Sequence, residues 1–507
     1  MPSRPEKVEP IRKVATGIPG FEYVAMGGLP RGRATLVSGN AGCGKTVFAA
    51  QFLAEGVRQG EPGVFITFEE SPRDIRRNMA DFGWDIPAWE AAGHWSFVDA
   101  SPDPHDQHTE AGEYDLDALL VRIEHAVKET GASRLAIDSL GAIFSRFADS
   151  AVVRRELFRM ASMLKNLGVT AVITAERTAE FGEVTRFGVE EFVVDNVVIL
   201  RNAIDAEKRR RMIEVLKFRG TSHRKGEYPF TIRPDKGIVV IPLSAIELKH
   251  DASSRRITSG NVALDEMCGG GFFRDSVVLV SGATGSGKTL IANSFLAGGI
   301  REGERCLLLA YEESRGQLFR NAASWGMDFA AMERDGRLKV ISVYPESDSL
   351  EDHLIRIKVE IEAFRPDRIA LDSLSALERG SSERSFREFV IALTSFIKQD
   401  GIACLYTTTT PELLGGGSVT DSNVSTITDA VVLLRYVEHA SELGRALVVL
   451  KMRGSSHDKR IRSYTIDSDG MHIGPPVRRA AGVISGLPGE SMQDTEEPVS
   501  GGHEELS

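Results

Sequence analysis

Several features that would indicate other classes of protein are missing from this chain of 507 residues. No apolar stretch approaches the roughly 20 residues that a membrane-spanning helix needs, and the first residues lack the apolar core of a signal peptide. The four cysteines are scattered without C-x-x-C spacing, which argues against disulfides and against a zinc site. These absences predict a cytoplasmic protein without a membrane segment.

An excess of basic residues is also missing. The chain has 61 Lys and Arg against 72 Asp and Glu, so its formal net charge is −11. A dedicated nucleic-acid binder usually carries a basic stripe, so this balance disfavours DNA or RNA as the main partner. The hydrophobic content of 42% is ordinary for a globular protein, and the length suits two α/β domains.

The strongest positive signal is a glycine-rich motif that occurs twice, at 39–46 and at 282–289. Both copies fit G-x-x-x-x-G-K-[ST], and both lie between an apolar β-branched run and a helix-like run. In that setting backbone N–H groups surround phosphates, the lysine reaches the β- and γ-phosphates, and the threonine hydroxyl holds Mg²⁺. The alternative is a pair of glycine-rich turns without a ligand, which the matched context makes implausible. The sequence therefore predicts ATP and Mg²⁺ as ligands in both halves.

Equivalent residues in the two halves are separated by nearly constant distances. Lys45 and Lys288 lie 288 − 45 = 243 residues apart, and Asp138 and Asp372 lie 372 − 138 = 234 apart. A repeat with this period indicates two copies of one domain. We predict a first domain over 11–243, a linker over 244–256, a second domain over 257–473 and a largely disordered tail over 474–507. Strands that alternate with helices within each copy predict an α/β fold with a mostly parallel sheet covered by helices.

Paired acids follow the next strand of each copy, as Glu69 and Glu70 and as Glu312 and Glu313. Successive carboxylates at a strand end point to opposite sides. One of each pair can therefore face the nucleotide, where it orients or deprotonates the attacking nucleophile. A solvated acidic corner is the alternative, but recurrence at the same distance from both lysines favours catalysis.

An apolar strand in each copy ends in an aspartate, Asp138 in Leu135-Ala-Ile-Asp and Asp372 in Ile369-Ala-Leu-Asp. Such an aspartate beside a phosphate loop is the Walker-B arrangement, in which it helps to hold Mg²⁺.

A cationic signature lies near the end of each copy, as Lys217-Phe-Arg-Gly-Thr-Ser-His223 and Lys451-Met-Arg-Gly-Ser-Ser-His457. A lone K-x-R-G is most often a hairpin turn. If the domains form a ring, these cations can instead reach a neighbour's γ-phosphate, as an arginine finger does.

One hydroxyl-rich stretch, from Thr420 to Asp429, occurs only in the second copy. Hydroxyls before an apolar strand are usually capping or turn residues. The first copy lacks the paired hydroxyls at the corresponding place, so the two halves have diverged in chemistry.

With these motifs the sequence resembles KaiC, the cyanobacterial circadian clock ATPase and autokinase. The resemblance runs from about 16 to about 485 and includes 152–158, 264–272 and 425–429. It implies two RecA-like domains, a double ring of six subunits, and ATP between neighbours. It also implies a slow ATPase in the first domain and, in the second, phosphate transfer to Ser425 and Thr426 of the adjacent subunit, with Thr420 as an alternate acceptor.

The resemblance also assigns roles to individual residues. Glu69 and Glu312 match the catalytic glutamates, and Mg²⁺ would lie on Thr46 in one domain and on Thr289 with Glu312 in the other. The nucleotide contacts of the first domain would be Gly42, Cys43, Gly44, Lys45, Thr46 and Val47, with Lys217, Phe218, Arg219, Thr221 and His223 from a neighbour. Those of the second would be Thr284, Gly285, Ser286, Gly287, Lys288, Thr289, Leu290, Trp325, Arg445, Lys451, Met452, Arg453, Ser455, His457 and Lys459.

Three departures from the family pattern limit the resemblance. Asp81 stands where the family has a contact serine, and Ser456 replaces a tryptophan. The short acidic C-terminus does not match the segment that recruits KaiA, which argues against KaiA as a partner. A KaiB-like protein stays a candidate partner for the first domain.

Two other functions use the same motifs. A RecA-like DNA-dependent ATPase would need the same phosphate loops, but a basic, aromatic DNA-binding loop is not evident. An ATP-driven signalling scaffold without kinase activity would hydrolyse ATP without phosphorylating itself.

Overall fold

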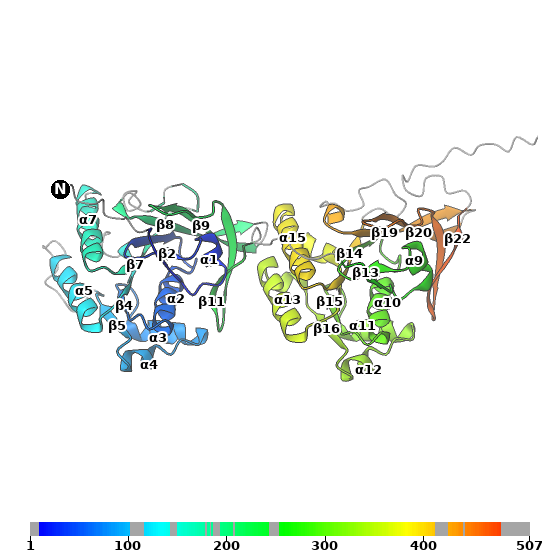
Figure 1. The fold of residues 1–507 in the computed structure, drawn as a ribbon, viewed down its shortest axis with the longest axis horizontal. Helices are drawn as coiled ribbons and strands as arrows, with labels where there is room; N and C mark the ends of the chain where they lie inside the picture. Colours follow the sequence, from blue (N-terminus) through cyan, green and yellow to red (C-terminus); the bar gives the residue numbers. More distant parts are fainter. Residues whose placement is uncertain are drawn as a thin grey trace, which may run out of the picture. The chain divides into compact units, whose positions relative to one another are not determined.

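The computed structural model describes residues 10–101, 116–141, 150–177, 180–182, 184–185, 193–205, 208–242, 253–410, 424–439 and 442–477. They fall into two compact units, each built around a nine-stranded sheet (Figure 1). The predicted tail from 478 onwards, most of the predicted linker and Thr420 lie outside the described residues.

The first domain consists of short strands that alternate with helices along the chain. Its elements are β1 (Lys13–Val14), α1 (Phe21–Val24), β2 (Leu29–Pro30), β3 (Ala34–Gly39), α2 (Lys45–Arg58), β4 (Gly63–Thr67), α3 (Pro72–Met79), η1 (Ala80–Phe82), α4 (Ile86–Ala91), β5 (Trp95–Asp99), α5 (Leu116–Thr130), β6 (Arg134–Asp138), α7 (Ser150–Asn166), β7 (Thr170–Glu176), β8 (Asn196–Asp205), β9 (Lys208–Phe218), β10 (Glu227–Arg233) and β11 (Gly237–Val240).

The second domain repeats that order. Its elements are β12 (Arg256–Ile257), α9 (Val262–Met267), β13 (Phe272–Phe273), β14 (Val277–Gly282), α10 (Lys288–Arg301), β15 (Cys306–Ala310), α11 (Arg315–Ser324), α12 (Phe329–Arg334), β16 (Leu338–Ser342), η3 (Pro345–Ser347), α13 (Leu350–Phe364), β17 (Arg368–Asp372), α14 (Leu374–Arg379), α15 (Glu383–Gln399), β18 (Ala403–Thr409), η4 (Val424–Thr426), β19 (Ala430–His439), β20 (Glu442–Met452), β21 (Arg462–Asp467) and β22 (Gly470–Pro476).

The two sheets have the same topology. The first has the order β11-β10-β9-β8-β3-β7-β6-β4-β5, and the second has β22-β21-β20-β19-β14-β18-β17-β15-β16. Strands from β8 to β5 pair in parallel, whereas β9, β10 and β11 add an antiparallel edge. The prediction of two α/β domains with mostly parallel sheets is confirmed, and each has the RecA-like architecture.

Alternating side chains of the first sheet build a separate core on each face. Val37 of β3 packs with Phe48 of α2 in one core, while its neighbour Leu36 packs with Ile123 of α5 and Leu157 of α7 in the other. Figure 1 shows α2 on one side of this sheet and α5 and α7 on the other. This is the expected result of a two-residue side-chain period in a strand that is covered on both faces.

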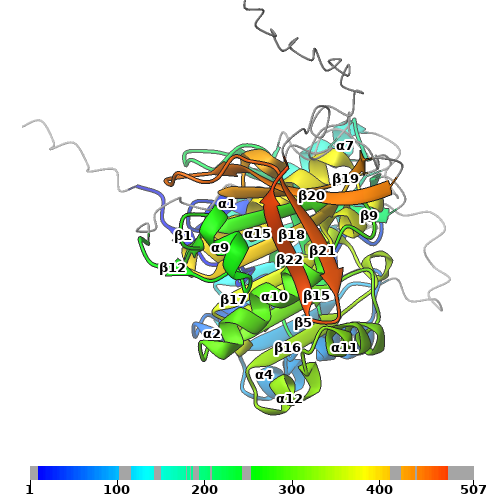
Figure 2. The ribbon, with the colours of Figure 1, turned by 90° about the vertical axis from the view of Figure 1, so that its right-hand side faces the viewer.

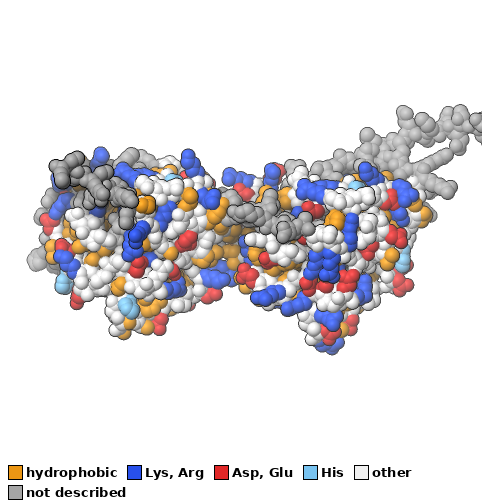
Figure 3. Space-filling model, viewed as in Figure 1, with side chains coloured by type: hydrophobic (Ala, Val, Ile, Leu, Met, Phe, Trp, Pro, Cys, Tyr) orange, Lys and Arg blue, Asp and Glu red, His pale blue; other side chains and the backbone are white. Residues whose placement is uncertain are grey.

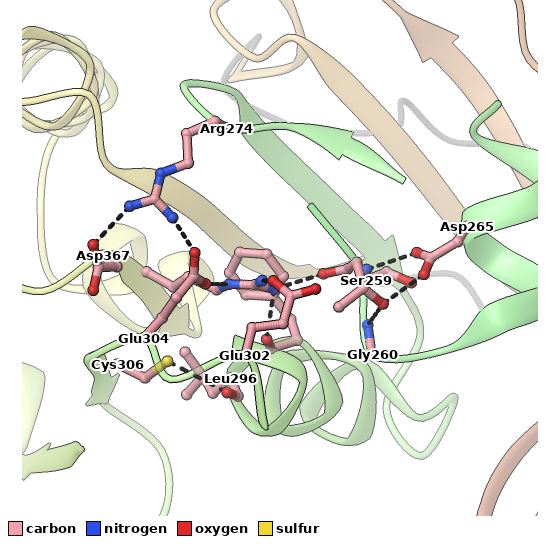
Figure 4. Close-up of polar contacts among 12 residues, drawn as sticks. Ser259, Gly260, Asp265, Arg274, Leu296, Glu302, Glu304, Cys306 and Asp367 are labelled. Atoms are coloured by element: carbon pink, nitrogen blue, oxygen red, sulfur yellow. Dashed lines mark hydrogen bonds and ion pairs between the residues drawn. The ribbon is translucent and has the colours of Figure 1, made fainter. Parts of the chain in front are cut away.

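Each domain contains an almost inaccessible arginine at the start of its Walker-B strand, Arg134 in β6 (1% exposed) and Arg368 in β17 (0%). Arg368 bonds to Glu302, Glu304 and two backbone carbonyls that belong to the segment before α9 and to α10. Figure 4 shows Arg274 joining Glu304 to Asp367 in the same cluster. These ion pairs hold the phosphate-loop helix against the strand that ends in Asp372.

Within the described residues, no helix combines the length and the apolar character that crossing a membrane requires.

Candidate nucleotide and phosphoacceptor sites

Both phosphate loops have the same local geometry. Gly44 and Gly287 precede α2 and α10 with φ of 97° and 95°, a left-handed conformation that favours glycine over residues with a Cβ. The Lys45 ammonium donates to the carbonyls of Gly39 and Asn40 at 2.9 and 3.0 Å. The loop carbonyls therefore hold the lysine, and the helix N–H groups are left for an anion.

The lysine of the second loop is more constrained by its surroundings. Lys288 is 8% exposed, and its Nζ donates to the carbonyls of Gly282 and Ala283, each at 2.9 Å. Burial lowers the pKa of Lys288, while Asp372 and Glu312 act in the opposite direction. A phosphate placed here would stabilise the ammonium further, because opposite charges interact strongly in a poorly hydrated site.

The oxygen groups expected to hold Mg²⁺ meet at the second loop. Thr289 Oγ1 donates to Asp372 at 2.7 Å, and Thr407 donates to the other oxygen of the same carboxylate. Burial raises the pKa of Asp372 and these hydrogen bonds oppose the rise. A hard cation such as Mg²⁺ prefers oxygen donors and keeps some of its waters, so this pair fits it. In the first domain, Thr174 donates to Asp138.

The structure distinguishes the two glutamates of each pair. Glu70 accepts a hydrogen bond from Asn78 and Glu313 accepts one from Asn321, both at 3.0 Å. Burial raises the pKa of Glu313, and the charge of nearby Asp372 raises it further. The second glutamate of each pair is thus fixed by the following helix.

The first glutamate of each pair is exposed and has a different partner in each domain. Ser139 Oγ donates to Glu69 at 2.8 Å, whereas the Arg379 guanidinium donates to Glu312 at 2.8 Å. An exposed carboxylate at a strand end is the better candidate for a catalytic base. Of the four predicted catalytic glutamates, the geometry therefore favours Glu69 and Glu312.

The cationic signatures lie at the opposite ends of the strands from the phosphate loop of their own domain. Strand β19 runs parallel to β14, with Ala430 beside Val278 and Leu434 beside Gly282. Lys451, near the end of antiparallel β20, pairs with Val431 at the start of β19. The loop follows Gly282 at the other end. Strand β14 has five residue steps (282 − 277) of about 3.3 Å each, so its two ends lie roughly 17 Å apart.

The expected phosphoacceptors lie beside that signature. Ser425 and Thr426 form the 3₁₀ turn η4, in which Thr426 is exposed. Lys451 Nζ donates to the carbonyls of Ser425 and Thr428 at 2.8 and 2.6 Å. Arg453 donates to the carbonyl of Thr426 at 2.8 Å. These contacts fix the backbone of the acceptor turn from one side.

Asp429 and Lys398, to which the sequence analysis gave no role, support this turn. The backbone N–H of Val277, the first residue of β14, donates to Asp429, and Lys398 of α15 lies 2.7 Å from the same carboxylate. Lys217, which begins the cationic signature of the first domain as Lys451 does in the second, donates to the carbonyl of Val194. An aspartate just before an apolar strand was visible in the sequence, but its lysine partner was not.

The other predicted nucleotide residues occupy several places and do not form one cluster. Trp325 ends α11 and packs against the core, and the Arg445 guanidinium lies 5.7 Å from the Tyr436 ring. Ser455 accepts from Arg256, and the His223 ring packs edge-on against Phe218. Phe218, Arg219, Thr221, Met452, His457 and Lys459 belong to the signature segments at the edge opposite the loops. Of these groups, Arg445 lies beside the second loop of its own domain, because the hydroxyl of its neighbour Tyr436 bonds to the carbonyl of Thr284.

Comparison with known proteins decides the family. A sequence model described as ATPase: KaiC matches residues 14–245 and 257–478. The chain belongs to the KaiC family of ATPases. The KaiC resemblance predicted from the motifs is therefore confirmed, and each nine-stranded domain corresponds to one copy of the family's ATPase unit.

Several relatives match over nearly their full length. A protein of Synechocystis sp. named circadian clock protein KaiC3 is 60% identical over 98% of both chains. Circadian clock oscillator protein KaiC of Thermostichus vulcanus is 54% identical over 94% of this chain and 92% of its own. The protein of that name from Synechococcus elongatus is 51% identical over 98% of this chain and 96% of its own.

Proposed function

We propose that this KaiC-family ATPase forms homohexameric rings, binds Mg-ATP between neighbouring subunits, and phosphorylates Ser425 and Thr426 of an adjacent copy through its second domain. The names of its relatives support a role in circadian timing or a related signalling process. A KaiB-like protein on the first domain is the partner we propose.

The observation that carries the kinase proposal is the position of the acceptor turn. Asp429, next to that turn, bonds to Val277 at the start of β14, whereas the phosphate loop follows the end of that strand. Hydrogen bonding and near-attack positions require reacting atoms about 3–3.5 Å apart. The strand that separates the turn from the loop is roughly 17 Å long, which supports donation of the phosphate by another copy.

The cationic signatures support the same arrangement. Lys451 and Arg453 bond to the backbone of the acceptor turn, at the strand ends away from the loop of their own domain. In a ring, the acceptor edge of one subunit faces the loop of the next. The cations would then stabilise charge on the γ-phosphate in the transition state, as arginine fingers do.

Each group has a defined task in the proposed transfer. Lys288 and the N–H groups of the loop hold the triphosphate, and Thr289 with Asp372 would hold Mg²⁺, which neutralises phosphate charge when bound. The hydroxyl of Thr426 or Ser425 attacks the γ-phosphorus and gives its proton to Glu312 of the donor copy. The bond between the γ-phosphorus and the β–γ bridging oxygen breaks, and ADP leaves.

In the first domain the same proposal assigns hydrolysis. No paired hydroxyls occupy the place that corresponds to Ser425 and Thr426. Water would therefore be the nucleophile, oriented by Glu69, while Lys45, Thr46 and Asp138 hold the nucleotide and its metal. The charge distribution gives no support to a DNA-dependent ATPase, because basic and acidic side chains are intermixed on the face shown in Figure 3.

Site-resolved mass spectrometry after incubation with Mg-ATP tests the kinase proposal. We expect phosphate on Ser425 and Thr426, and its loss when both residues are changed to alanine. Steady ATP hydrolysis with no added phosphate on the intact chain would instead favour the signalling scaffold. Label that persists in the double alanine variant would refute the acceptor assignment.

A further inference from the structure

A row of three side chains crosses the sheet beside the second phosphate loop. Tyr436 of β19 pairs with Arg445 of β20, and the neighbouring pair Ala446–Ser463 places Arg445 opposite Tyr464 of β21. Residues directly opposite one another in antiparallel strands share a face. Figure 2 shows β21 and β22 crossing beside α10, the helix that begins at this loop.

Both tyrosine hydroxyls donate to carbonyls of the loop. The buried Tyr464 bonds to the carbonyl of Ser286 at 2.5 Å, and the more exposed Tyr436 bonds to that of Thr284 at 3.3 Å. Ser286 adds a third bond, from its own hydroxyl to the carbonyl of Ala283 at 2.7 Å. Three side-chain donors therefore fix three carbonyls of one short loop, those of Ala283, Thr284 and Ser286.

These bonds determine where the loop N–H groups point. In a planar trans peptide, the C=O of one residue and the N–H of the next point in opposite directions. Fixing the carbonyls of Thr284 and Ser286 toward the tyrosines therefore directs the N–H groups of Gly285 and Gly287 away from them. Both glycines have positive φ, 78° and 95°, so without support their peptide planes could rotate more freely.

The first domain has the same row without the hydroxyls. Asn202 of β8 pairs with Arg211 of β9, and the neighbouring pair Met212–Pro229 places Arg211 opposite Phe230 of β10. Phe230 is buried and has no hydrogen-bond donor in its side chain. Cys43 stands where the second loop has Ser286. The arginine is common to both domains, whereas the loop-binding hydroxyls belong to the second.

We propose that Tyr464, assisted by Tyr436, is a positioning residue that fixes the second phosphate loop and sets ATP affinity in the second domain alone. This inference rests on the proposed use of that loop as an ATP site. The hydroxyl of Tyr464 acts through the backbone and does not touch the nucleotide. Its removal weakens phosphate binding by allowing the N–H groups to turn away.

Site-resolved photoaffinity labelling of the full chain with 8-azido-ATP tests the proposal. Labelled peptides are assigned to the first domain (11–243) or to the second (257–473), so the first domain is an internal control. For Tyr464→Phe we expect the half-saturating concentration to rise about two- to tenfold in the second domain, the usual effect of one hydrogen bond. The first-domain curve should stay in place, and Tyr436→Phe should have a smaller effect.

A matched control removes a buried hydroxyl elsewhere in the same domain. Tyr406 of β18 is fully buried and its hydroxyl bonds to Thr394, not to the loop. Tyr406→Phe should leave both labelling curves unchanged. Competition by adenosine, which has no phosphate, should be equally effective against wild type and Tyr464→Phe, because a positioning role affects phosphate binding only.

The outcomes separate the inference from the function on which it rests. Coincident second-domain curves for wild type and Tyr464→Phe would overturn the positioning role. The positioning role would also be overturned if the half-saturating concentration rose equally in both domains, or if adenosine competition weakened as much as ATP binding does. Either result would show that the hydroxyl only supports the fold. If neither domain of the wild-type chain is labelled, the proposal that the two domains bind ATP is itself refuted.

Discussion

The two domains share a backbone plan but differ in the side chains around the nucleotide loop. Strand order, register and the loop lysine contacts are the same in both. The exposed glutamate is bonded to Ser139 in the first domain and to Arg379 in the second. Among the described residues, the hydroxyls of Ser425 and Thr426 and the loop-binding tyrosines occur in the second domain. The duplication thus preserved the phosphate site, while chemistry diverged at positions that do not alter the fold.

Removing a loop lysine should produce the largest difference between the activities of the two domains. We expect Lys288→Ala to reduce phosphate incorporation at Ser425 and Thr426 by on the order of 100-fold, because a positioned cation is lost from the transition state. Lys45→Ala should reduce first-domain hydrolysis and leave the second loop able to bind ATP. Quantitative phosphopeptide analysis beside phosphate-release assays measures both. Equal losses of both activities in each variant would contradict the division of labour.

The buried arginines test whether the two domains are stabilised independently. Arg368→Met should destabilise the second domain by about 3–5 kcal/mol, since it leaves the buried Glu304 with Arg274 as its remaining cation and removes the donor to two backbone carbonyls. Arg134→Met should do the same to the first domain, where Glu61 keeps Arg31 as its remaining cation. Hydrogen exchange resolved by domain is the measurement.

Arg460→Met is the matched control for these variants, because Arg460 is exposed and pairs with Asp458 at the surface. It should change stability far less than either buried arginine does, because exposed ion pairs contribute little. Similar loss of protection in all three variants would show that burial of the ion pairs is not what matters.

The ion pair between Arg379 and Glu312 sharpens the contrast between the catalytic carboxylates. Arg379→Gln should free Glu312 to turn toward a nucleophile and change the rate of the second domain by about fivefold at most, the range of an exposed pair. Stability and first-domain hydrolysis should not change. Initial rates of phosphate incorporation report the effect, and a rate unchanged within error would mean that the pair does not restrain Glu312.

The smallest expected effect is a pH dependence confined to the first domain. Burial lowers the pKa of His223, and the charges of Lys13 and Lys225 lower it further. The folded domain then binds fewer protons than the unfolded chain, so its stability is complete above the ordinary histidine pKa of about 6.5 and declines as pH falls through it. Thermal melts from pH 7.5 to 5.5 should show a small decline that His223→Gln removes.

Features built from residues close together in the sequence were predictable, whereas contacts between residues far apart in the sequence were not. The phosphate loops were predictable because G-x-x-x-x-G-K-T is a local pattern with one structural solution. The aspartates that end β6 and β17 were predictable for the same reason. Tyr464 and Ser286 lie 178 residues apart, and a tyrosine in an alternating strand looks like a core residue. Its contact with the loop depends on strand register, which alternation alone does not determine.

The buried arginines were missed for a related reason. Arg368 meets carbonyls of Thr258 and Phe295, and backbone acceptors have no signature in the sequence. The opposite placement of loop and acceptor turn also required the structure, because it follows from parallel pairing of β14 with β19. Residue types therefore predicted which groups take part, and the sheet register placed the loop and the turn at opposite ends of β14.

The central claim, that phosphate crosses from one subunit to the acceptor turn of another, has a direct test. Chains with Lys288→Ala and intact acceptors are mixed before assembly with chains that carry Ser425→Ala and Thr426→Ala and an intact loop. Neither kind should be phosphorylated alone, and the account predicts label on the acceptors of the Lys288→Ala chains once the two are assembled together with Mg-ATP. Acceptors that stay unlabelled in the mixed rings, while wild-type rings are labelled, would contradict it.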